Sequence, residues 1–558
     1  MCGIAGVFAY EASAPPVDEA ELLRVRDAMG RRGPDGAGLW LSPDQRAGLA
    51  HRRLAIIDLS ATGAQPMTTA DGRLTITFNG EIYNYKELRR NLDSSGVRLR
   101  SESDTEVLLH LVALHGPRAL EMLRGMFAFA VWNADDRSLL LARDSFGIKP
   151  LYYADDGCTV RFASQVKALL RAEGVDTTPN PAGSVGFFLW GSVPEPHTLF
   201  EGIRALPAGS HVTYRPGNPG QPRRFFSIRE ELASAADASQ ASDEQEFTWM
   251  REAVGDSVRH HLVADVPVGV FLSAGLDSTT VTAIASEVEG SDLRTLTLGF
   301  REFRGTGQDE VPLAEEVARR YGTRHSTSWV SEADFNAALP DLLAAMDQPT
   351  TDGVNTYFVS RAGAQAGMKV ALSGLGADEL FGGYPGFRQV PRMASSLRPF
   401  RAFPLLGRAT RRITEPLLRR FTSPKFAGLV EYGGSLAGAY LLRRALYAPW
   451  EVDRFMDREA VKEGLERLDT LSALSGTVDG LTTRHQKMVA LELSWYMRNQ
   501  LLRDADWAGM AHSLEIRVPF VDVQFFRRVA PLLARAKPPT KRSVASTPRS
   551  ALPQALLR

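Results

Sequence analysis

Short apolar segments alternate with amphipathic segments in the second half of the chain. Residues 268–272, 294–300 and 370–374 are short and largely apolar, without helical spacing, which predicts buried strands. Residues 244–262 and 309–321 instead have the pattern of helices. Strands that alternate with helices predict a parallel sheet, whose ligands bind beyond the carboxyl ends of the strands.

The first half of the chain predicts a different layering. Strands at 4–8, 51–58, 78–84 and 123–130 alternate with polar loops, so we expect a β-rich domain covered by helices. The Asn-Gly pair at residues 79–80 interrupts the third of these strands, and such a pair is by itself a strong signal of a hairpin turn. The two halves together predict an α/β protein of two domains.

A change of composition separates the two halves. Between residues 223 and 243 the chain loses apolar side chains and gains Ala, Ser, Glu and Asp. We therefore predict a first domain at 2–215, a linker at 216–243 and a second domain at 244–558.

Composition narrows the class of protein. Of 558 residues, 44% are hydrophobic and 23% are charged, while Lys+Arg and Asp+Glu balance at 65 each. Because the charges balance, the protein has no net positive electrostatic field that would attract nucleic acid or an anionic membrane. No apolar run is long enough to span a bilayer. The N-terminus lacks a basic leader, and two cysteines suit a reducing compartment. We expect a cytoplasmic protein that binds small molecules, not nucleic acid or a membrane.

Residues 268–280 combine a strand, a turn of small residues and the beginning of a helix. Free N–H groups and the positive end of the helix dipole converge at such a turn, which makes an anion site. The usual phosphate loop ends in Gly-Lys-Ser/Thr, whereas this segment has no lysine and has Asp277 instead. A carboxylate among phosphate oxygens requires a hard cation such as Mg²⁺ between them. The alternative interpretation is an ordinary strand-to-helix turn.

Cys2 is a second candidate for chemistry. Removal of Met1 would leave a thiol and a free α-amine on the same residue. An α-amine titrates near neutral pH and can deprotonate its own nucleophile. The alternative interpretation is a small buried cysteine on the strand at 4–8.

Motifs along the whole chain carry a resemblance to a known family. Residues 273–278 resemble the Ser-Gly-Gly-x-Asp-Ser pyrophosphate loop of ATP pyrophosphatases, with Ala274 in place of the first glycine of the pair. Cys2 and the motifs that follow it resemble the glutaminase domain of the N-terminal-nucleophile glutamine amidotransferases; these motifs lie at 31–36, 51–58, 78–84, 101–106, 123–130 and 141–153. Together the two halves resemble the glutamine-hydrolysing asparagine synthetases. The resemblance implies an N-terminal-nucleophile hydrolase αββα sandwich followed by a parallel-sheet domain of the adenine-nucleotide α-hydrolase type.

The resemblance assigns roles in the first domain. Cys2 would attack the glutamine side chain, and the Asn79 amide with the Gly80 N–H would form the oxyanion hole. Arg53 would bind the α-carboxylate of glutamine. Glu81 and Asp104 would bind its α-ammonium group.

The resemblance also assigns roles in the second domain. It places ATP against Leu272, Ser273, Gly275, Asp277, Ser278, Ser373 and Gly374, and Mg²⁺ between Asp277 and Asp378. Lys541 stands twelve residues before Pro553, the spacing of the family's catalytic lysine, which stabilises charge on the α-phosphate. Residues implied to lie near this site are Glu515, Arg517 and Asp522.

Besides Ala274, three positions depart from the family. Leu375 stands where the family has Glu, a residue that acts around the reacting carboxylate and ammonia, and Ala377 replaces a Ser. Ala545 replaces the Arg four positions after the lysine. These departures bear on the acceptor more than on the reaction class.

The implied reaction is ATP-dependent amide formation, with ATP and Mg²⁺ as cofactors. Glutamine would supply ammonia at Cys2, and a carboxylate in the second domain would form an acyl-adenylate that ammonia converts to an amide. Aspartate as acceptor gives asparagine. Alternatives are another carboxylate, ring closure by an internal amine, and a non-catalytic ATP-binding protein on the same scaffold. The partners are then glutamine, the acceptor and ATP, and the resemblance is compatible with a homodimer.

Overall fold

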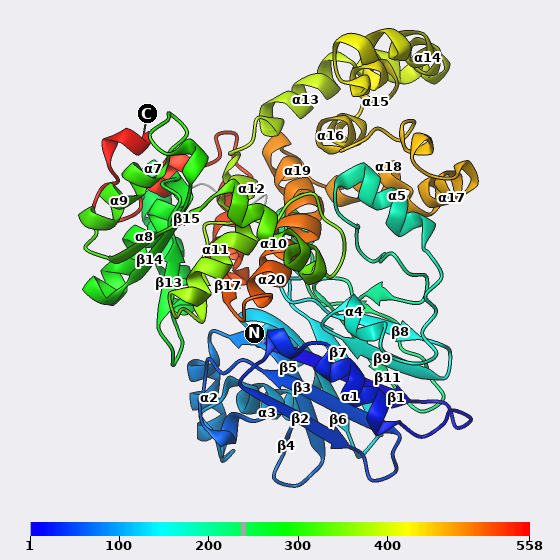
Figure 1. The fold of residues 1–558 in the computed structure, drawn as a ribbon, viewed down its shortest axis with the longest axis vertical. Helices are drawn as coiled ribbons and strands as arrows, with labels where there is room; N and C mark the ends of the chain where they lie inside the picture. Colours follow the sequence, from blue (N-terminus) through cyan, green and yellow to red (C-terminus); the bar gives the residue numbers. More distant parts are fainter. Residues whose placement is uncertain (1, 236–241, 558) are drawn as a thin grey trace.

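Two six-stranded antiparallel sheets form the first domain in the computed structural model, which describes residues 2–235 and 242–557 (Figure 1). In spatial order the first sheet contains β10 (Arg204–Ala205), β8 (Tyr152–Asp155), β9 (Thr159–Ala163), β1 (Gly3–Ala9), β3 (Ala47–Arg53) and β2 (Gly36–Leu41). The second contains β12 (Arg223–Arg224), β11 (Ser210–Tyr214), β7 (Ser138–Arg143), β6 (Gly125–Asn133), β5 (Leu74–Ile82) and β4 (Met67–Thr68).

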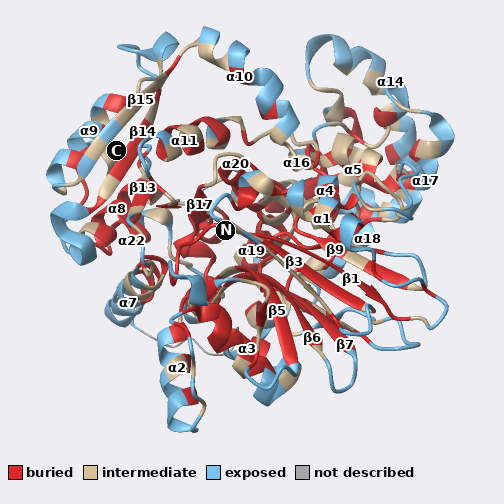
Figure 2. Ribbon diagram, turned by 60° about the horizontal axis from the view of Figure 1, so that its bottom comes forward, coloured by how far each residue is buried: buried red, intermediate tan, exposed pale blue. Residues whose placement is uncertain are grey.

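The two sheets pack face to face and carry helices on their outer faces. Between them lie Phe8 of β1 and Trp132 of β6, whose rings meet edge to face at 5.1 Å. The helices are α1 (Glu19–Asp27) and α4 (Val166–Leu169) on the first sheet, and α2 (Tyr85–Ser94) and α3 (Asp104–His115) on the second. The central strands β1, β5, β6 and β7 are almost wholly buried, as Figure 2 shows. The four layers confirm the predicted αββα sandwich.

A five-stranded parallel sheet organises the second domain. Its order is β15 (Arg324–Val330), β14 (Arg294–Phe300), β13 (Val268–Phe271), β16 (Val370–Leu372) and β17 (Glu515–Arg517). The predicted parallel sheet is therefore confirmed. The helix after β13, α8 (Leu276–Glu289), begins before Ser278 and so includes Asp277 in its first turn.

Helices surround this sheet and extend away from it. Those of the sheet domain are α7 (Asp243–His261), α9 (Val311–Arg320), α10 (Glu332–Ala345), α11 (Val354–Gln365), α12 (Ala377–Phe381), α19 (Arg484–Leu491), α20 (Arg503–Met510), α21 (Val523–Leu533) and α22 (Lys541–Ala545). A π-helical segment, Glu492–Leu502, joins α19 to α20.

A second group of helices lies at the far end of the molecule from the first domain's sheets (Figure 1). It contains α13 (Gly386–Ser396), α14 (Pro404–Phe421), α15 (Leu429–Tyr432), α16 (Leu436–Arg444), α17 (Arg458–Leu468) and α18 (Thr470–Val478). The helix α5 (Pro181–Trp190) reaches out of the first domain and packs on α17, where Gly464 permits close approach to the carbonyl of Pro181.

The predicted linker covers residues 216–243, of which 236–241 lie outside the described residues. In its described part, β12 pairs with β11, and α6 (Ile228–Ser234) packs on α19 and α21. The predicted domain limits, 2–215 and 244–558, stay a prediction.

The two domains share one apolar core and buried ion pairs. Phe146 of the first domain packs against Phe526 of the second, with ring centroids 5.6 Å apart. Arg32 holds the Asp506 carboxylate through two hydrogen bonds of 2.7 and 3.0 Å. Charged pairs removed from water in this way fix how the domains sit, because either charge alone would be costly.

Candidate functional site

Cys2 lies directly before β1 and is 8% exposed. Its Sγ is 3.9 Å from the carbonyl oxygen of Leu54, and burial raises the pKa of the thiol. A thiol with a raised pKa is a poor nucleophile until a base removes its proton. Any chemistry at Cys2 therefore depends on groups placed around it, and we call this group of residues the Cys2 site: Cys2, Arg53, Asn79, Gly80, Glu81 and Asp104.

Asn79 and Gly80 lie inside β5, which runs through them without interruption, so the predicted break in this strand is wrong. The Cys2 backbone N–H donates to Asn79 Oδ1 at 2.9 Å. Asn79 Nδ2 is buried and has no hydrogen-bond partner among the described residues. A buried donor without a partner costs free energy, so a ligand oxygen at this position would be stabilised. At Gly80 a Cβ would stand 2.1 Å from the Met126 carbonyl oxygen, so only glycine allows β5 and β6 to pair here.

Arg53, at the end of β3, is held by backbone carbonyls. Its guanidinium donates to the carbonyl oxygens of Asp58 and Ser60. No carboxylate within residues 2–235 and 242–557 forms an ion pair with it, which leaves it available to an anionic ligand.

Two buried acids complete the Cys2 site. Asp104 Oδ2 accepts from the Ile82 N–H at 3.0 Å, and burial raises the pKa of Asp104 to about 6. Burial and the nearby Glu515 raise the pKa of Glu81 well above its usual value. Glu81 Oε2 is 3.4 Å from Arg517, a contact too long and misaligned for a hydrogen bond. A ligand ammonium would lower both pKa values and supply the missing partner.

A cavity of about 460 Å³ opens at the carboxyl ends of β13, β14 and β16, which we call the second-domain pocket. The sequence-predicted residues that line it are Leu272, Ser273, Gly275, Asp277, Ser278, Ser373, Gly374, Asp378 and Lys541. Phe271, Leu296 and Val359 give it an apolar wall of the kind on which a planar ring packs.

The loop before α8 is held closed by its own side chains. Ser278 Oγ accepts from the Ser273 N–H and donates to the Gly275 carbonyl oxygen, both at 3.2 Å. Ala274 takes a left-handed conformation with φ of 55°, where glycine would be unstrained. A Cβ at Gly374 would stand 2.9 Å from Asp277 Cβ, so the two loops touch and enclose one space.

Lys541 lies between the two acids predicted to bind a metal. Its Nζ is 2.8 Å from Asp277 Oδ2 and 2.6 Å from Asp378 Oδ1. Burial disfavours the ammonium, but the two carboxylates outweigh it and raise the pKa of Lys541. Burial also raises the pKa of Asp277 to about 6 despite Lys541. One cation thus holds two carboxylates together in the absence of ligand.

The chemistry of this pair fits Mg²⁺. Two carboxylates converge on a single cationic atom, and Mg²⁺ is commonly held by one or two carboxylates together with substrate phosphates. No group of three or more His, Cys, Asp and Glu side chains in the described parts of the chain could hold a metal alone. The remaining oxygen ligands would therefore come from phosphates and water.

Among the polar residues of this pocket that the sequence motifs did not assign are Glu379 and Tyr384, together with Glu310, Asn355 and Thr356. Tyr384 donates to Glu379 Oε1 at 2.6 Å, and both line the pocket beside Leu375. Burial raises the pKa of Glu379 to about 7. Glu379 lies in the short helix α12, four residues after Leu375, which precedes that helix.

The sequence placed Glu515, Arg517 and Asp522 near the second-domain pocket, and for two of them the structure shows otherwise. Arg517 contacts Glu81 of the Cys2 site, and Asp522 binds Arg124 Nε at 2.8 Å. Successive side chains of a strand point to opposite faces, so of β17 only Ile516 lines the pocket. These residues join the domains.

Arg32 is a further residue whose role the sequence did not reveal. Its Nε donates to the Cys2 carbonyl oxygen at 3.0 Å while its terminal nitrogens bind Asp506 of α20. Its partner Asp506 lies 474 residues away in the sequence. The one signal in the sequence was an arginine within a segment of turn-forming residues. Arg32 thus fixes the backbone of Cys2 to the second domain.

Within the described residues no helix is long and apolar enough to cross a membrane.

Family models match both halves: residues 1–225 match a glutamine amidotransferase domain and residues 250–545 match asparagine synthase.

Named relatives are similar over most of the chain. A glutamine-hydrolysing asparagine synthetase of Bacillus subtilis is 35% identical over 94% of this chain and 80% of its own length. A putative glutamine-hydrolysing asparagine synthetase of Mycobacterium bovis is 34% identical over 96% of this chain and 82% of its own length. The amidase chry2 of Gibberella zeae is 30% identical over 70% of this chain and 60% of its own length. The chain belongs to the glutamine-hydrolysing asparagine synthetase family.

Proposed function

We propose that the protein forms an amide from a carboxylate, with glutamine as ammonia donor and ATP as energy source. We propose aspartate as the acceptor, so that the product is asparagine. The observation that carries the proposal is the second-domain pocket, where Asp277, Asp378 and Lys541 converge at the carboxyl ends of a parallel sheet. The names of the Bacillus and Mycobacterium relatives support the same reaction.

In the Cys2 site, Cys2 Sγ attacks the side-chain carbonyl carbon of glutamine. The α-amine exposed by removal of Met1 takes the thiol proton and passes it to the leaving nitrogen, so ammonia departs and a thioester remains. The unpartnered Asn79 Nδ2 and the Gly80 N–H stabilise the oxyanion. Water then hydrolyses the thioester to glutamate and restores the thiol.

The other residues of the Cys2 site hold the amino-acid end of glutamine. Arg53, which has no carboxylate partner in the described residues, pairs with the α-carboxylate. Glu81 and Asp104, whose pKa values burial raises, pair with the α-ammonium, and its charge lowers both pKa values.

In the second-domain pocket, the acceptor carboxylate attacks the α-phosphate of ATP and pyrophosphate leaves. Ammonia from the Cys2 site then attacks the acyl-adenylate and AMP leaves. Lys541 moves from its carboxylate partners to the phosphate and stabilises charge there. Held by Asp277 and Asp378, Mg²⁺ would neutralise phosphate charge. Ser273, Ser278 and the first N–H groups of α8 bind the leaving pyrophosphate.

A carboxylate other than aspartate is the second candidate acceptor. Leu375 lines the pocket where the family's glutamate would be, and a leucine can neither accept a proton nor bind an ammonium group. An acceptor with a less polar body would find an apolar contact at this position.

We propose a cytoplasmic location, because Cys2 and Cys158 are both free and the chemistry requires a reduced thiol at Cys2. A homodimer stays a prediction.

The test is incubation of the protein with Mg-ATP, glutamine and aspartate, followed by mass spectrometry of amino acids and nucleotides. We expect asparagine, glutamate, AMP and pyrophosphate in equal amounts. Glutamate without AMP would reject aspartate as acceptor, and a panel of carboxylates would follow. Binding of Mg-ATP without AMP for any member of that panel would reject the enzyme and leave a binding protein.

A further inference from the structure

A cavity of about 300 Å³ lies where the first domain, the linker and the second domain meet. It is separate from the Cys2 site and the second-domain pocket, with which it shares no residue. The first domain contributes Glu195, and β12, within the predicted linker, contributes Arg224. The second domain contributes Thr477 of α18 and Arg498 of the π-helical segment. We call it the arginine pocket.

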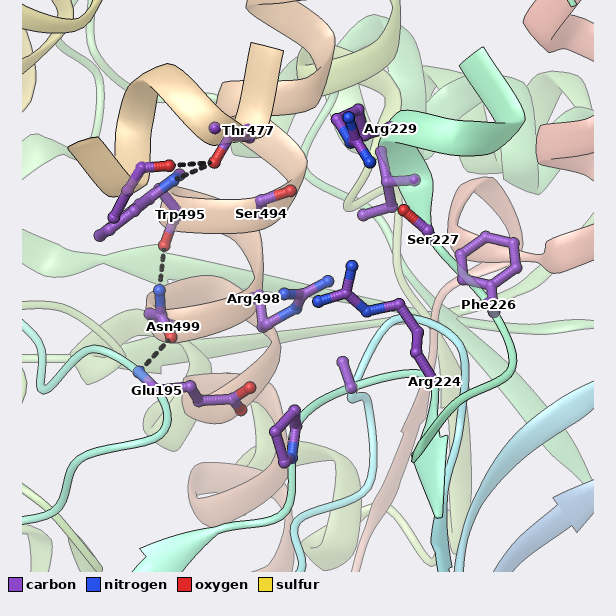
Figure 3. Close-up of a pocket in the computed structure, with 15 residues that line it drawn as sticks. Glu195, Arg224, Phe226, Ser227, Arg229, Thr477, Ser494, Trp495, Arg498 and Asn499 are labelled. Atoms are coloured by element: carbon purple, nitrogen blue, oxygen red, sulfur yellow. Dashed lines mark hydrogen bonds between the residues drawn. The ribbon is translucent and has the colours of Figure 1, made fainter. Parts of the chain in front are cut away.

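Two arginines face each other across the arginine pocket, and neither forms an ion pair with a carboxylate of the described residues. Figure 3 shows the guanidinium groups of Arg224 and Arg498 pointing toward one another. Arg498 Nε donates to the Phe146 carbonyl oxygen at 3.3 Å, and its two terminal nitrogens have no partner in the described ranges. Arg224 makes no side-chain hydrogen bond or ion pair with any described residue. Burial lowers the pKa of Arg498, and Arg143 and Arg224 lower it further, while the carboxylates of Glu195 and Asp144 oppose this shift.

The acid that lines this pocket is already paired. Glu195 Oε1 accepts from Arg143 at 2.6 Å, so this carboxylate already has a cationic partner, although it also acts on Arg498 across the cavity. A third guanidinium, that of Arg229, points into the cavity from α6 and is 3.3 Å from the exposed Glu230. Exposed pairs of this kind contribute little. The cavity therefore has an excess of positive charge.

Neutral donors and a fixed frame complete the pocket. Hydroxyl groups of Ser227 and Ser494 line it, whereas the Thr477 hydroxyl, also in the lining, already donates to the Ala473 carbonyl oxygen at 2.9 Å. The Trp495 indole donates to Thr477 Oγ1 at 3.1 Å, and Asn499 Oδ1 accepts from the Glu195 N–H at 3.0 Å (Figure 3). The walls from the two domains are thus tied together before any ligand arrives.

We propose that the arginine pocket binds a compact phosphate-class oxyanion, such as phosphate or pyrophosphate, between Arg224 and Arg498. Guanidinium forks match phosphate oxygens in geometry and charge, and a multiply charged anion removes the repulsion between the two arginines. Hydroxyl donors approaching from other directions suit a tetrahedral group. Because the residues come from both domains, the bound anion bridges them and strengthens the domain interface.

Isothermal titration calorimetry with inorganic phosphate and pyrophosphate tests the proposal. EDTA is included so that metal-dependent binding in the second-domain pocket does not contribute. We expect the wild-type protein to bind, and Arg498→Met and Arg224→Met each to weaken binding by about ten-fold or more, as loss of a charge-assisted hydrogen bond predicts. Arg223→Met is the matched control, because Arg223 precedes Arg224 on β12 and does not line the pocket. It should bind as the wild-type protein does.

Thermal unfolding separates ligand binding from a purely structural role. Without anion, Arg498→Met should unfold at the same temperature as the wild-type protein or higher, because repulsion is relieved. With phosphate, only the wild-type protein and Arg223→Met should gain stability.

Three results would overturn the proposal. These are the absence of wild-type binding, unchanged binding in both Arg224→Met and Arg498→Met, and tighter binding of succinate than of either phosphate anion. Arg224 is exposed, so its variant will fold and decides the question if Arg498→Met does not. The inference does not depend on the proposed reaction.

Discussion

The Cys2 site and the second-domain pocket are prepared for their ligands in opposite ways. In the Cys2 site the reacting groups lie on or beside antiparallel strands and are almost fully buried, with Asn79 already bound to the nucleophile's backbone. In the second-domain pocket the charged groups come from loops and helix ends, and Lys541 joins Asp277 to Asp378 until a ligand replaces it. The Cys2 site can receive its substrate without breaking an ion pair. In the second-domain pocket, a ligand must replace the ion pairs between Lys541 and the two carboxylates.

If the two sites are independent, the largest effect should come from the nucleophile. Cys2→Ala should lower glutamine hydrolysis by roughly 10⁴-fold or more, because no other group can form the thioester. Synthesis from ammonium chloride should stay near the wild-type rate, measured as AMP release. The matched control is Cys158→Ala, which removes the other free cysteine and should change neither rate. Loss of the ammonia-dependent reaction in Cys2→Ala would contradict the independence of the sites.

The reciprocal variant removes the acid that both Lys541 and a metal would use. Asp277→Asn should lower pyrophosphate release by about 100-fold or more, since it removes charge opposite the triphosphate. Glutaminase activity should remain, as measured by glutamate formation. Glu316→Gln, on the exposed side of α9, is the control. Pyrophosphate release at the wild-type rate would reject the assignment of Asp277.

The preformed oxyanion donor can be separated from its anchoring role. Asn79→Asp keeps an oxygen that accepts from the Cys2 N–H but removes the Nδ2 donor, whereas Asn79→Ala removes both. Both variants should lower kcat for glutamine hydrolysis by about 10²–10³-fold, with a smaller change in KM. Recovery of kcat in Asn79→Asp would show that anchoring of the backbone, not donation to an oxyanion, is what Asn79 supplies.

The smallest effect concerns pH. The pKa of Asp277 is about 6 in the folded protein, above the usual 3.8, so the carboxyl becomes protonated as pH falls through 6. Mg-ATP affinity should therefore fall by about four-fold between pH 7.5 and 5.5, because roughly a quarter of Asp277 stays ionised at the lower pH.

Stability has the opposite dependence on this group. Between pH 3.8 and 6 the folded state binds more protons at Asp277 than the unfolded state, so the group's contribution to the free energy of unfolding falls as pH rises. The Mg-ATP affinity is measured by titration of a fluorescent ATP analogue. In Asp277→Asn this affinity should not change between pH 7.5 and 5.5. An equally steep profile in that variant would assign the effect to another group.

Local sequence patterns predicted many of the elements, whereas most candidate site residues came from the family resemblance. The strand at 294–300 has the predicted limits, and the loop after β13 opens a helix as expected. The resemblance pointed to Lys541 as a residue of the ATP site, and the structure has it 2.8 Å from Asp277, while its catalytic role stays a prediction. What failed depends on tertiary contacts: β5 continues through Asn79 because β6 pairs along its whole length. Arg517 faces Glu81 because the pleat of β17 turns it away from the second-domain pocket.

The arginines that cross the domain boundary limit how this chain can be recombined with its relatives. Arg32 and Arg124 belong to the first half, and the carboxylates that balance them, Asp506 and Asp522, lie near the end of the second. A hybrid spliced at the linker inherits each cation from one parent and its anion from the other. If the second parent lacks the matching carboxylate, each buried arginine left without its partner lowers the free energy of unfolding by about 3–5 kcal/mol. The two halves therefore have to come from the same parent protein, although each has a fold of its own.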